Sequence, residues 1–188
     1  MYDDWAPTRY DADLAEWGYE APQRAAAMLA AAVTTGPVLD AGCGTGLVGV
    51  ELRQLGIGPV IGGDFSPVSV ETARRRGVYE QVVELDLNAL LAFDDRRFRA
   101  VVSVGVFSYL TDSEATVREL LRVVEPGGRV LFTQRTDLWD ERDFTSLLHG
   151  LADEGVCDVS VTEPQPYLPR HPEFGGEIGI RYATLIRC

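Results

Sequence analysis

The stretch Val38-Leu39-Asp40-Ala41-Gly42-Cys43-Gly44-Thr45-Gly46 decides the fold of this 188-residue chain. A short apolar run ends in a carboxylate and leads into a turn with glycine at every second position, and a helical pattern begins at Leu47. Because glycine lacks a Cβ and tolerates positive φ, such a turn lets a ligand approach the backbone closely. The next apolar run, 60–63, ends in a second carboxylate, Asp64. A strand–turn–helix–strand unit with an acid at each strand end is typical of a site for a ribose-bearing cofactor at the carboxyl edge of a parallel sheet.

The spacing of these glycines and the place of Asp40 separate two classes of cofactor. A dinucleotide brings a pyrophosphate to the start of the helix and goes with the spacing G-x-G-x-x-G, whereas this chain has G-x-G-x-G. A carboxylate two residues before the first glycine would repel a pyrophosphate. It would attract S-adenosylmethionine (SAM), which carries an ammonium and a sulfonium and no phosphate. We therefore predict SAM over NAD, and a glycine-rich turn without any ligand is the remaining alternative.

Length, composition and charge predict one globular domain and narrow the choice of partners. With 188 residues, 46% of them apolar, the chain can bury one sizeable core. No run is long enough to span a membrane, and the acidic start, Met1-Tyr2-Asp3-Asp4-Trp5, is unlike a signal peptide, so we expect a cytoplasmic protein. A net charge of −12 argues against nucleic acid or an anionic membrane as the main partner. We expect a small-molecule partner and a monomer or homodimer.

The cysteines and basic residues exclude further chemistry. Cys43, Cys157 and Cys188 are too few and too scattered for a disulfide framework or a zinc site, so we expect free thiols. Cys43, inside the glycine turn, is expected to fill space rather than act as a nucleophile. All 17 basic residues are arginine, so chemistry that forms a Schiff base on lysine is absent.

Apolar runs that alternate with helical patterns predict a mostly parallel sheet covered by helices. The expected strands are 38–41, 60–63, 82–85, 100–104 and 129–134, followed by an antiparallel pair, 156–162 and 178–186. The expected helices are 11–33 in two pieces, 47–55, 66–76, 112–124 and 140–154, and a long loop covers 163–177. The predicted fold class is α/β: a single-domain, Rossmann-like three-layer sandwich around a seven-stranded, mostly parallel sheet with an antiparallel last strand. Residues 1–188 form one domain, with 1–36 as an N-terminal helical lid and 37–188 as the core.

This layout resembles the class I SAM-dependent methyltransferases over essentially the whole chain. The motifs that carry the resemblance are 40–46, 63–67, Asp86 after the third strand, 102–105, and 120–128 before the fifth strand. Within that superfamily the chain is most similar to the Williams–Beuren-region methyltransferase-like group. That resemblance rests on residues 2–7, 10–13, 43–48, 73–79, 104–106 and 133–136.

The resemblance implies a role for each acid at the sheet edge. Asp64 would accept both ribose hydroxyls of SAM, because a carboxylate has two oxygens and can bridge a diol. Asp86 would accept from the adenine amine, and the backbone of Leu87 would pair with the ring. Asp40 would hold the ammonium, directly or through water. A turn or helix-capping role is the alternative for Asp64 and Asp86.

Other positions complete the expected cofactor site. Gly42 and Gly44 allow backbone approach to the methionine part, and Val104 would sit beside the methyl-bearing sulfur. Tyr10 would fold over the cofactor, or else pack the N-terminal segment onto the core. The expected cofactor-binding residues are Tyr10, Asp40, Gly42, Cys43, Gly44, Gly46, Asp64, Phe65, Asp86, Leu87 and Val104.

Methyl transfer from a sulfonium is an in-line displacement, so the protein mainly supplies proximity and alignment. A base is needed only where the acceptor must first lose a proton, and the candidates for catalysis are His171, in the long loop, and Tyr109, after the fourth strand. No cluster with metal-ligand spacing follows the fourth strand, so we expect no metal. The sequence thus predicts metal-independent transfer to O, N or C of a small molecule. The alternative is a SAM-binding protein with a regulatory or non-methylating function.

Overall fold

The computed structural model describes residues 7–173 and 175–188; the predicted domain also includes residues 1–6, which lie outside the described part. Within the described residues, eight strands form one sheet in the order β3-β2-β1-β4-β5-β8-β6, and β7 pairs with β8. The strands are β1 (Val38–Ala41), β2 (Val60–Asp64), β3 (Gln81–Glu84), β4 (Phe98–Ser103), β5 (Val124–Arg135), β6 (Cys157–Val161), β7 (Gln165–Pro166) and β8 (Gly179–Arg187).

The sheet is parallel from β3 to β5 and antiparallel around β8, as predicted. Strand β5 begins at Val124 rather than at Arg129, because Val124 pairs with Phe98 before the register shifts and Arg129 pairs with Ala100. Strand β7 interrupts the predicted long loop, since Gln165 pairs with Ile180.

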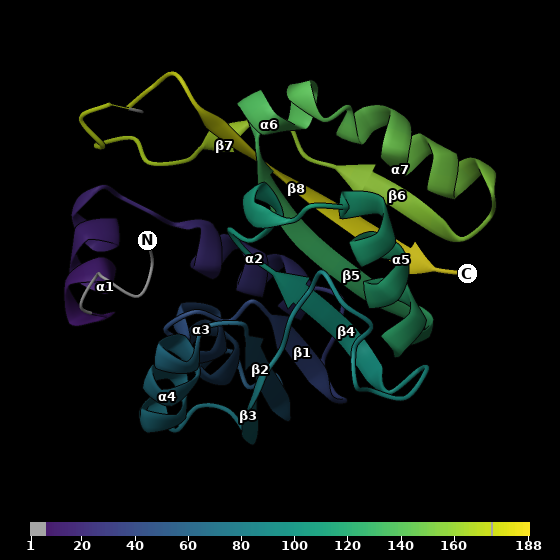
Figure 1. Ribbon diagram of the computed structural model, residues 1–188, viewed down its shortest axis with the longest axis horizontal. Coiled ribbons are helices and arrows are strands. Elements are labelled where there is room, and N and C mark those ends of the chain that lie inside the picture. The colour runs from purple at the N-terminus through teal and green to yellow at the C-terminus, as the bar shows by residue number, and fades with distance from the viewer. Residues whose placement is uncertain (1–6, 174) are drawn as a thin grey trace.

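Helices cover both faces of the sheet (Figure 1). One face packs against α5 (Ser113–Val123), α6 (Thr136–Glu141) and α7 (Phe144–Asp153) in a core that contains Phe107, Phe132 and Phe144. The other face packs against α2 (Ala21–Ala30), α3 (Leu47–Gln54) and α4 (Pro67–Arg76). The single helix predicted over 140–154 is two helices, because Asp143 takes a φ of 46° and caps α7 through the amide of Ser146.

Helix α4 lies within the range 66–76 that the sequence predicts, and local signals set both of its ends. Ser66 caps α4 by accepting from the amide of Ser69 at 3.3 Å, and Pro67 occupies the first turn, where a missing N–H costs nothing. Gly77 ends the helix with a φ of 64°. The cap at Ser66 places the start of α4 directly after β2, at the carboxyl edge of the sheet.

Two segments lie over that edge. Helix α1 (Pro7–Glu16) and the loop between β7 and β8 lie on the same side of the molecule, at the left of Figure 1. They meet through Arg170, whose guanidinium donates to the carbonyl of Ala15 at 3.0 Å and whose amide donates to the carbonyl of Trp17 at 3.1 Å. Among the described residues no helix is long and apolar enough to cross a membrane.

Candidate functional site

The glycine turn joins β1 to α3 and takes a backbone path suited to glycine. The φ values of Gly42, Gly44 and Gly46 are 81°, 54° and 96°. The amides of Gly42 and Cys43 both donate to the carbonyl of Gly63, at 2.7 and 2.9 Å, which ties the turn to the end of β2. A Cβ built on Gly44 would meet no described atom within 4 Å. The turn therefore presents bare backbone to the space above it.

Asp64, at the end of β2, connects the glycine turn to the start of α4. Its Oδ2 accepts from the amide of Gly44 at 2.8 Å, and its Oδ1 accepts from the amide of Ser66 at 2.9 Å. Each carboxylate oxygen has two lone pairs, so both oxygens retain acceptor capacity for a diol. The structural and the ligand-binding interpretations of Asp64 are therefore compatible.

Asp40 is fully buried at the end of β1. Its Oδ2 accepts from the hydroxyl of Tyr79 at 2.6 Å, while its Oδ1 has no hydrogen-bond partner in the described chain. Burial raises the pKa of Asp40 to about 7, against the lowering effect of the Tyr79 hydrogen bond and with a further increase from Asp64. Such an unsatisfied buried oxygen is costly unless a ligand or water completes it.

Cys43 is buried beside these carboxyl groups and is poorly suited to act as a nucleophile. Burial raises the pKa of its thiol, and the negative charges of Asp40 and Asp64 raise it further. Since the thiolate is the reactive form, this environment keeps Cys43 inert, in keeping with the space-filling role expected from the sequence.

The residues expected at the adenine side lie on the turns after β2 and β3. Phe65 is 75% exposed, an unusual state for a phenylalanine, and it directly follows Asp64. Asp86 accepts from the amide of Asn88 at 2.9 Å, which makes it a turn-forming acid at the strand end. Leu87 is buried, and its carbonyl accepts from the hydroxyl of Thr116 at 2.9 Å. The adenine contacts of these three residues stay predictions.

The turn after β4 packs directly on the glycine turn. A Cβ built on Gly42 would lie 2.3 Å from Cγ2 of Val106, so the two turns are in contact. Gly105 donates its amide to Oγ1 of Thr133 at 2.9 Å. Val104 precedes this pair and is partly buried, at the place expected to face the reacting atom. The carboxyl ends of β1, β4 and β5 thus form one connected surface.

Tyr109 ends the 3-10 turn after β4 and is 61% exposed. Burial raises the pKa of Tyr167, on the loop between β7 and β8, and the nearby Tyr109 raises it further. Arg135, at the end of β5, brings a positive charge near Tyr109 and Tyr167, and its guanidinium pairs with Asp137. Tyr109 therefore lies where three segments that could form an acceptor pocket meet.

His171 lies on the loop between β7 and β8 and faces α1. Its ring packs edge-on against Trp17 with centroids 4.4 Å apart, and its Nδ1 accepts from the amide of Glu173 at 3.1 Å. These contacts place His171 in the cover over the edge of the sheet. A role as a base stays a prediction.

Sequence reasoning missed the polar contacts that fasten α1 to the glycine turn. Asp11 accepts from the hydroxyl of Thr45 at 2.6 Å and pairs with Arg76, and Arg76 also bonds the carbonyl of Thr45. Tyr10, the expected cover residue, is the neighbour of Asp11 on α1 and is partly buried. We call Asp11, Thr45 and Arg76 the lid latch.

The structure also adds Tyr79, the last residue of the 73–79 motif, to the site, because its hydroxyl donates to Asp40. Its distinguishing signal was the sequence Arg76-Gly77-Val78-Tyr79, in which a helix stop is followed by an aromatic residue before β3. In the described part of the chain, no group of three or more His, Cys, Asp or Glu side chains could hold a metal ion.

The part of the chain that forms this site is similar in sequence to known methyltransferases. Residues 39–132, half of the chain, match the family described as "Methyltransferase domain". Human methyltransferase-like protein 27 is 38% identical over 144 residues, which cover 73% of this chain and 57% of that protein. Demethylmenaquinone methyltransferase of Thermus thermophilus is 37% identical over 99 residues, 50% of this chain and 44% of that enzyme. Mouse probable tRNA methyltransferase 9B is 35% identical over 100 residues, 50% of this chain and 20% of that protein. The chain matches little more than half, or less, of each of these curated relatives.

Solved structures share the whole fold. In the complex between the Haloferax volcanii Trm112 methyltransferase activator and a candidate methyltransferase, the matched chain superposes with a TM-score of 0.72. The match covers 100% of this chain and 97% of that one at 19% sequence identity, so it supports the fold alone.

Proposed function

Because the chain belongs to the methyltransferase-domain family of class I SAM-dependent methyltransferases, we propose that it transfers the methyl group of SAM to a small-molecule acceptor. The acceptor atom is O, N or C, and the transfer is a metal-independent, in-line displacement. We further place the chain in the Williams–Beuren-region methyltransferase-like group. Its 38% identity to human methyltransferase-like protein 27 supports that placement.

One observation carries the cofactor assignment. Open space lies above Gly44, and two carboxyl groups border the turn: Asp64, which retains acceptor capacity, and Asp40, whose buried Oδ1 lacks a partner. These two hydrogen-bond acceptors fit a ligand with a diol at one end and a cation at the other. It does not fit a pyrophosphate, because no cation is hydrogen-bonded to either carboxyl group among the described residues.

In this proposal, different residues of the site bind different parts of the cofactor. Asp64 would hold the ribose hydroxyls, and the turn around Gly44 would hold the methionine part, with Asp40 beneath it as the acceptor for the ammonium. Phe65 would cover a face of the adenine, and Asp86 with Leu87 would read its edge. Tyr10 and the lid latch would close the site from above.

When bound, SAM supplies an electrophilic methyl group on a sulfonium, so little covalent chemistry is left to the protein. The turn after β4 would align the acceptor, because Val104 and Gly105 stand at the strand end beside the glycine turn. Helix α1 and the loop between β7 and β8 would exclude water. Alignment of this kind can supply a large part of the rate enhancement.

Tyr109 and His171 are the proposed acceptor-side residues. Tyr109 would contact the acceptor, since it lies near Tyr167 and Arg135 at the meeting of three segments. His171 would accept a proton only from an acceptor with a high pKa, such as a hydroxyl, because an amine or an activated carbon is already nucleophilic.

Charge favours a small acceptor over RNA. Nucleic-acid binding needs a basic surface, and the chain has a net charge of −12. The relatives act on both classes by name, a demethylmenaquinone in one case and tRNA in another. The names of the relatives' substrates therefore do not separate the two acceptor classes, and the net charge is what supports the proposal of a small acceptor.

The test is to purify the chain, identify any co-purified ligand by native mass spectrometry, and measure S-adenosylhomocysteine (SAH) binding by calorimetry. SAM is then incubated with small-molecule extracts, with tRNA, and with EDTA, and SAH release is followed. We expect SAH binding, turnover with a small-molecule fraction and no loss with EDTA. Binding without turnover on any fraction would favour the regulatory or non-methylating alternative. Turnover on tRNA alone would overturn the acceptor class.

We propose that the chain acts as a monomer or homodimer. The Haloferax relative of this fold was solved with a Trm112 activator, so the alternative is a heteromeric partner. Analytical ultracentrifugation of the purified chain, alone and with SAH, gives its oligomeric state, and the turnover assay above shows whether the chain is active without a partner. An active monomer or homodimer supports the proposal, and activity that requires an added partner overturns it.

A further inference from the structure

Three glycines make room for a single aromatic ring beneath the glycine turn. A Cβ on Gly49 would lie 2.3 Å from Tyr79, and Cβ atoms on Gly62 and Gly46 would lie 3.1 and 3.2 Å from its ring. Gly49 lies inside α3, where glycine costs about 1 kcal/mol relative to alanine. Positions on a turn, a helix and a strand are therefore all kept small around Tyr79.

The ring delivers a hydroxyl to a defined place. Tyr79 donates to Oδ2 of Asp40 at 2.6 Å, and Asp40 has no exposed surface. The other oxygen, Oδ1, has no hydrogen-bond partner in the described chain. The Tyr79 hydroxyl thus holds Oδ2 of Asp40, and Oδ1 can still accept a hydrogen bond from a ligand.

The groups around Asp40 make the Tyr79 hydroxyl its main favourable side-chain contact. Asp64 and Cys43 face it from β2 and the glycine turn, and each would repel a carboxylate when ionised. The backbone amide of Gly49 on α3 is the other favourable neighbour. Burial raises the pKa of Tyr79, and Asp40 raises it further, so the tyrosine remains a neutral donor.

We propose that Tyr79 is a positioning residue, which holds Asp40 so that its second oxygen accepts the α-ammonium of the bound cofactor. This inference rests on the proposed SAM site. It follows that the site distinguishes adenosine ligands with an α-ammonium from those without one, and that Tyr79 provides this discrimination without touching the ligand.

The experiment compares two ligands on one variant. SAH carries the α-ammonium, and 5′-methylthioadenosine has the same adenosine and thioether without the amino-acid end. Tyr79→Phe keeps the ring in its pocket and removes only the hydroxyl. We expect SAH affinity, measured by calorimetry, to fall about tenfold or more, and methylthioadenosine affinity to change less than about twofold. Tyr182→Phe, which removes another buried tyrosine hydroxyl on β8, is the control and should change neither affinity.

The pH dependence provides a readout that packing alone would not move. In the wild type, SAH affinity should rise between about pH 5.5 and 7, as Asp40 ionises while an α-ammonium stays largely protonated. In Tyr79→Phe the pKa of Asp40 rises further, so the increase should move to higher pH. Methylthioadenosine should show no such increase in either protein.

Each outcome decides a separate question. Equal loss of both ligands in Tyr79→Phe would make Tyr79 a packing residue, and an unchanged SAH affinity would show that Asp40 does not depend on the Tyr79 hydroxyl. Either result overturns the inference and leaves the proposed function standing. Wild-type protein that binds neither ligand would overturn the proposed function as well. If Tyr79→Phe does not fold, Gly49→Ala replaces it, because its Cβ would lie 2.5 Å from the Tyr79 hydroxyl and would displace it from Asp40. Selective loss of SAH affinity supports the inference, and an unchanged SAH affinity refutes it.

Discussion

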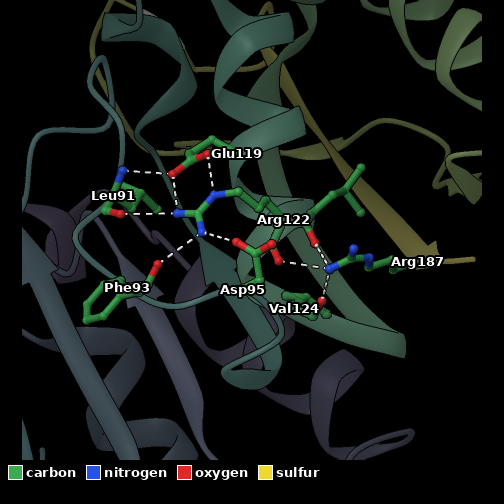
Figure 2. Close-up of polar contacts among 8 residues, drawn as sticks. Leu91, Phe93, Asp95, Glu119, Arg122, Val124 and Arg187 are labelled. Carbon is green, nitrogen blue, oxygen red and sulfur yellow. Dashed lines mark hydrogen bonds and ion pairs between the residues drawn. The ribbon is translucent and has the colours of Figure 1, made fainter.

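The charged side chains at the two edges of the same sheet have different hydrogen-bond partners. At the carboxyl edge, Asp40 and Asp64 are bonded by a hydroxyl and by backbone amides. At the amino edge, Arg122 pairs with Glu119 and Asp95 and donates to two backbone carbonyls, and Arg187 donates to three. Figure 2 shows this second network. Its labelled members are Leu91, Phe93, Asp95, Glu119, Arg122, Val124 and Arg187.

This difference in partners indicates that the amino edge contributes mainly to stability and the carboxyl edge to the proposed ligand binding. The amino-edge network joins α5, β5, β8 and the segment before β4, so its polar groups have partners within the chain. At the carboxyl edge Oδ1 of Asp40 has no hydrogen-bond partner in the described chain, which costs stability unless a ligand or water completes it. In the proposed function that ligand is the cofactor's ammonium. Substitutions at the two edges should therefore change different quantities.

The largest expected effect is at the glycine turn. Gly44→Val places a side chain in the open space above the turn and should lower SAH affinity by about 4 kcal/mol or more, roughly 1000-fold, in calorimetry. Gly77→Val is the matched control, because Gly77 also has a positive φ and open surroundings but caps α4. Both variants should lose similar stability, about 1–2 kcal/mol, from the left-handed backbone. Normal SAH binding by Gly44→Val would mean that the turn is not the cofactor cradle.

Asp64→Ala should cost about 2–4 kcal/mol of SAH affinity, roughly 30- to 1000-fold, because two ribose hydroxyls lose their acceptor. The amides of Gly44 and Ser66 lose theirs too, so circular dichroism must confirm that the variant is folded. Asp95→Ala, an acid of the amino edge, is the control and should leave the affinity unchanged. A folded Asp64→Ala protein with wild-type affinity would refute the ribose assignment.

Arg122→Ala should reverse this pattern. We expect the free energy of unfolding in urea to fall by about 2–3 kcal/mol, because Glu119 and two carbonyls lose their donor, with no change in SAH affinity. Arg118→Ala on the same helix removes more exposed ion pairs and should cost less than about 1 kcal/mol. Similar losses in the two variants would show that the network adds nothing beyond surface charge.

The cost of Arg122→Ala should also depend on pH. Burial alone raises the pKa of Glu119, but the bonds from Arg122 and the amide of Leu91 outweigh it and lower the pKa below 4.5. A lowered folded-state pKa gives stability that is present above the unfolded value and lost as pH falls through the folded value. The difference between wild type and variant should therefore shrink in acid.

The smallest expected effect is at the lid latch. Asp11→Ala removes the acceptor for Thr45 and the partner of Arg76, so α1 should open more readily. We expect SAH to bind about three- to tenfold more weakly, mainly through faster dissociation in stopped-flow measurements. Asp13→Ala on the same helix, which pairs only loosely with Arg9 at 3.7 Å, should leave dissociation unchanged. Equal dissociation rates for Asp11→Ala and wild type would mean that α1 does not cover the ligand.

The sequence predicted what depends on neighbouring residues. The glycine turn, the cap at Ser66 and the acids at the strand ends follow from short-range rules of backbone geometry and capping. It missed contacts between distant residues: Tyr79 meets Asp40 across 39 positions, and Arg76 meets Asp11 across 65. It also missed the early start of β5, because Pro126-Gly127-Gly128 reads as a break until pairing with β4 absorbs it. Positions of this kind are set by tertiary packing rather than local propensity.

The contact between Val106 and Gly42 limits how the acceptor range of this protein can diversify. Position 106 stands on the turn after β4, which we propose to align the acceptor, yet its side chain occupies the space that a Cβ at position 42 would need. A library at position 106 would therefore yield functional variants with side chains of valine size or smaller, and larger ones would displace the cofactor turn. New acceptors would be gained most readily by changes in the loop between β7 and β8, because surface loops tolerate substitutions and insertions while the cofactor-binding half stays unchanged.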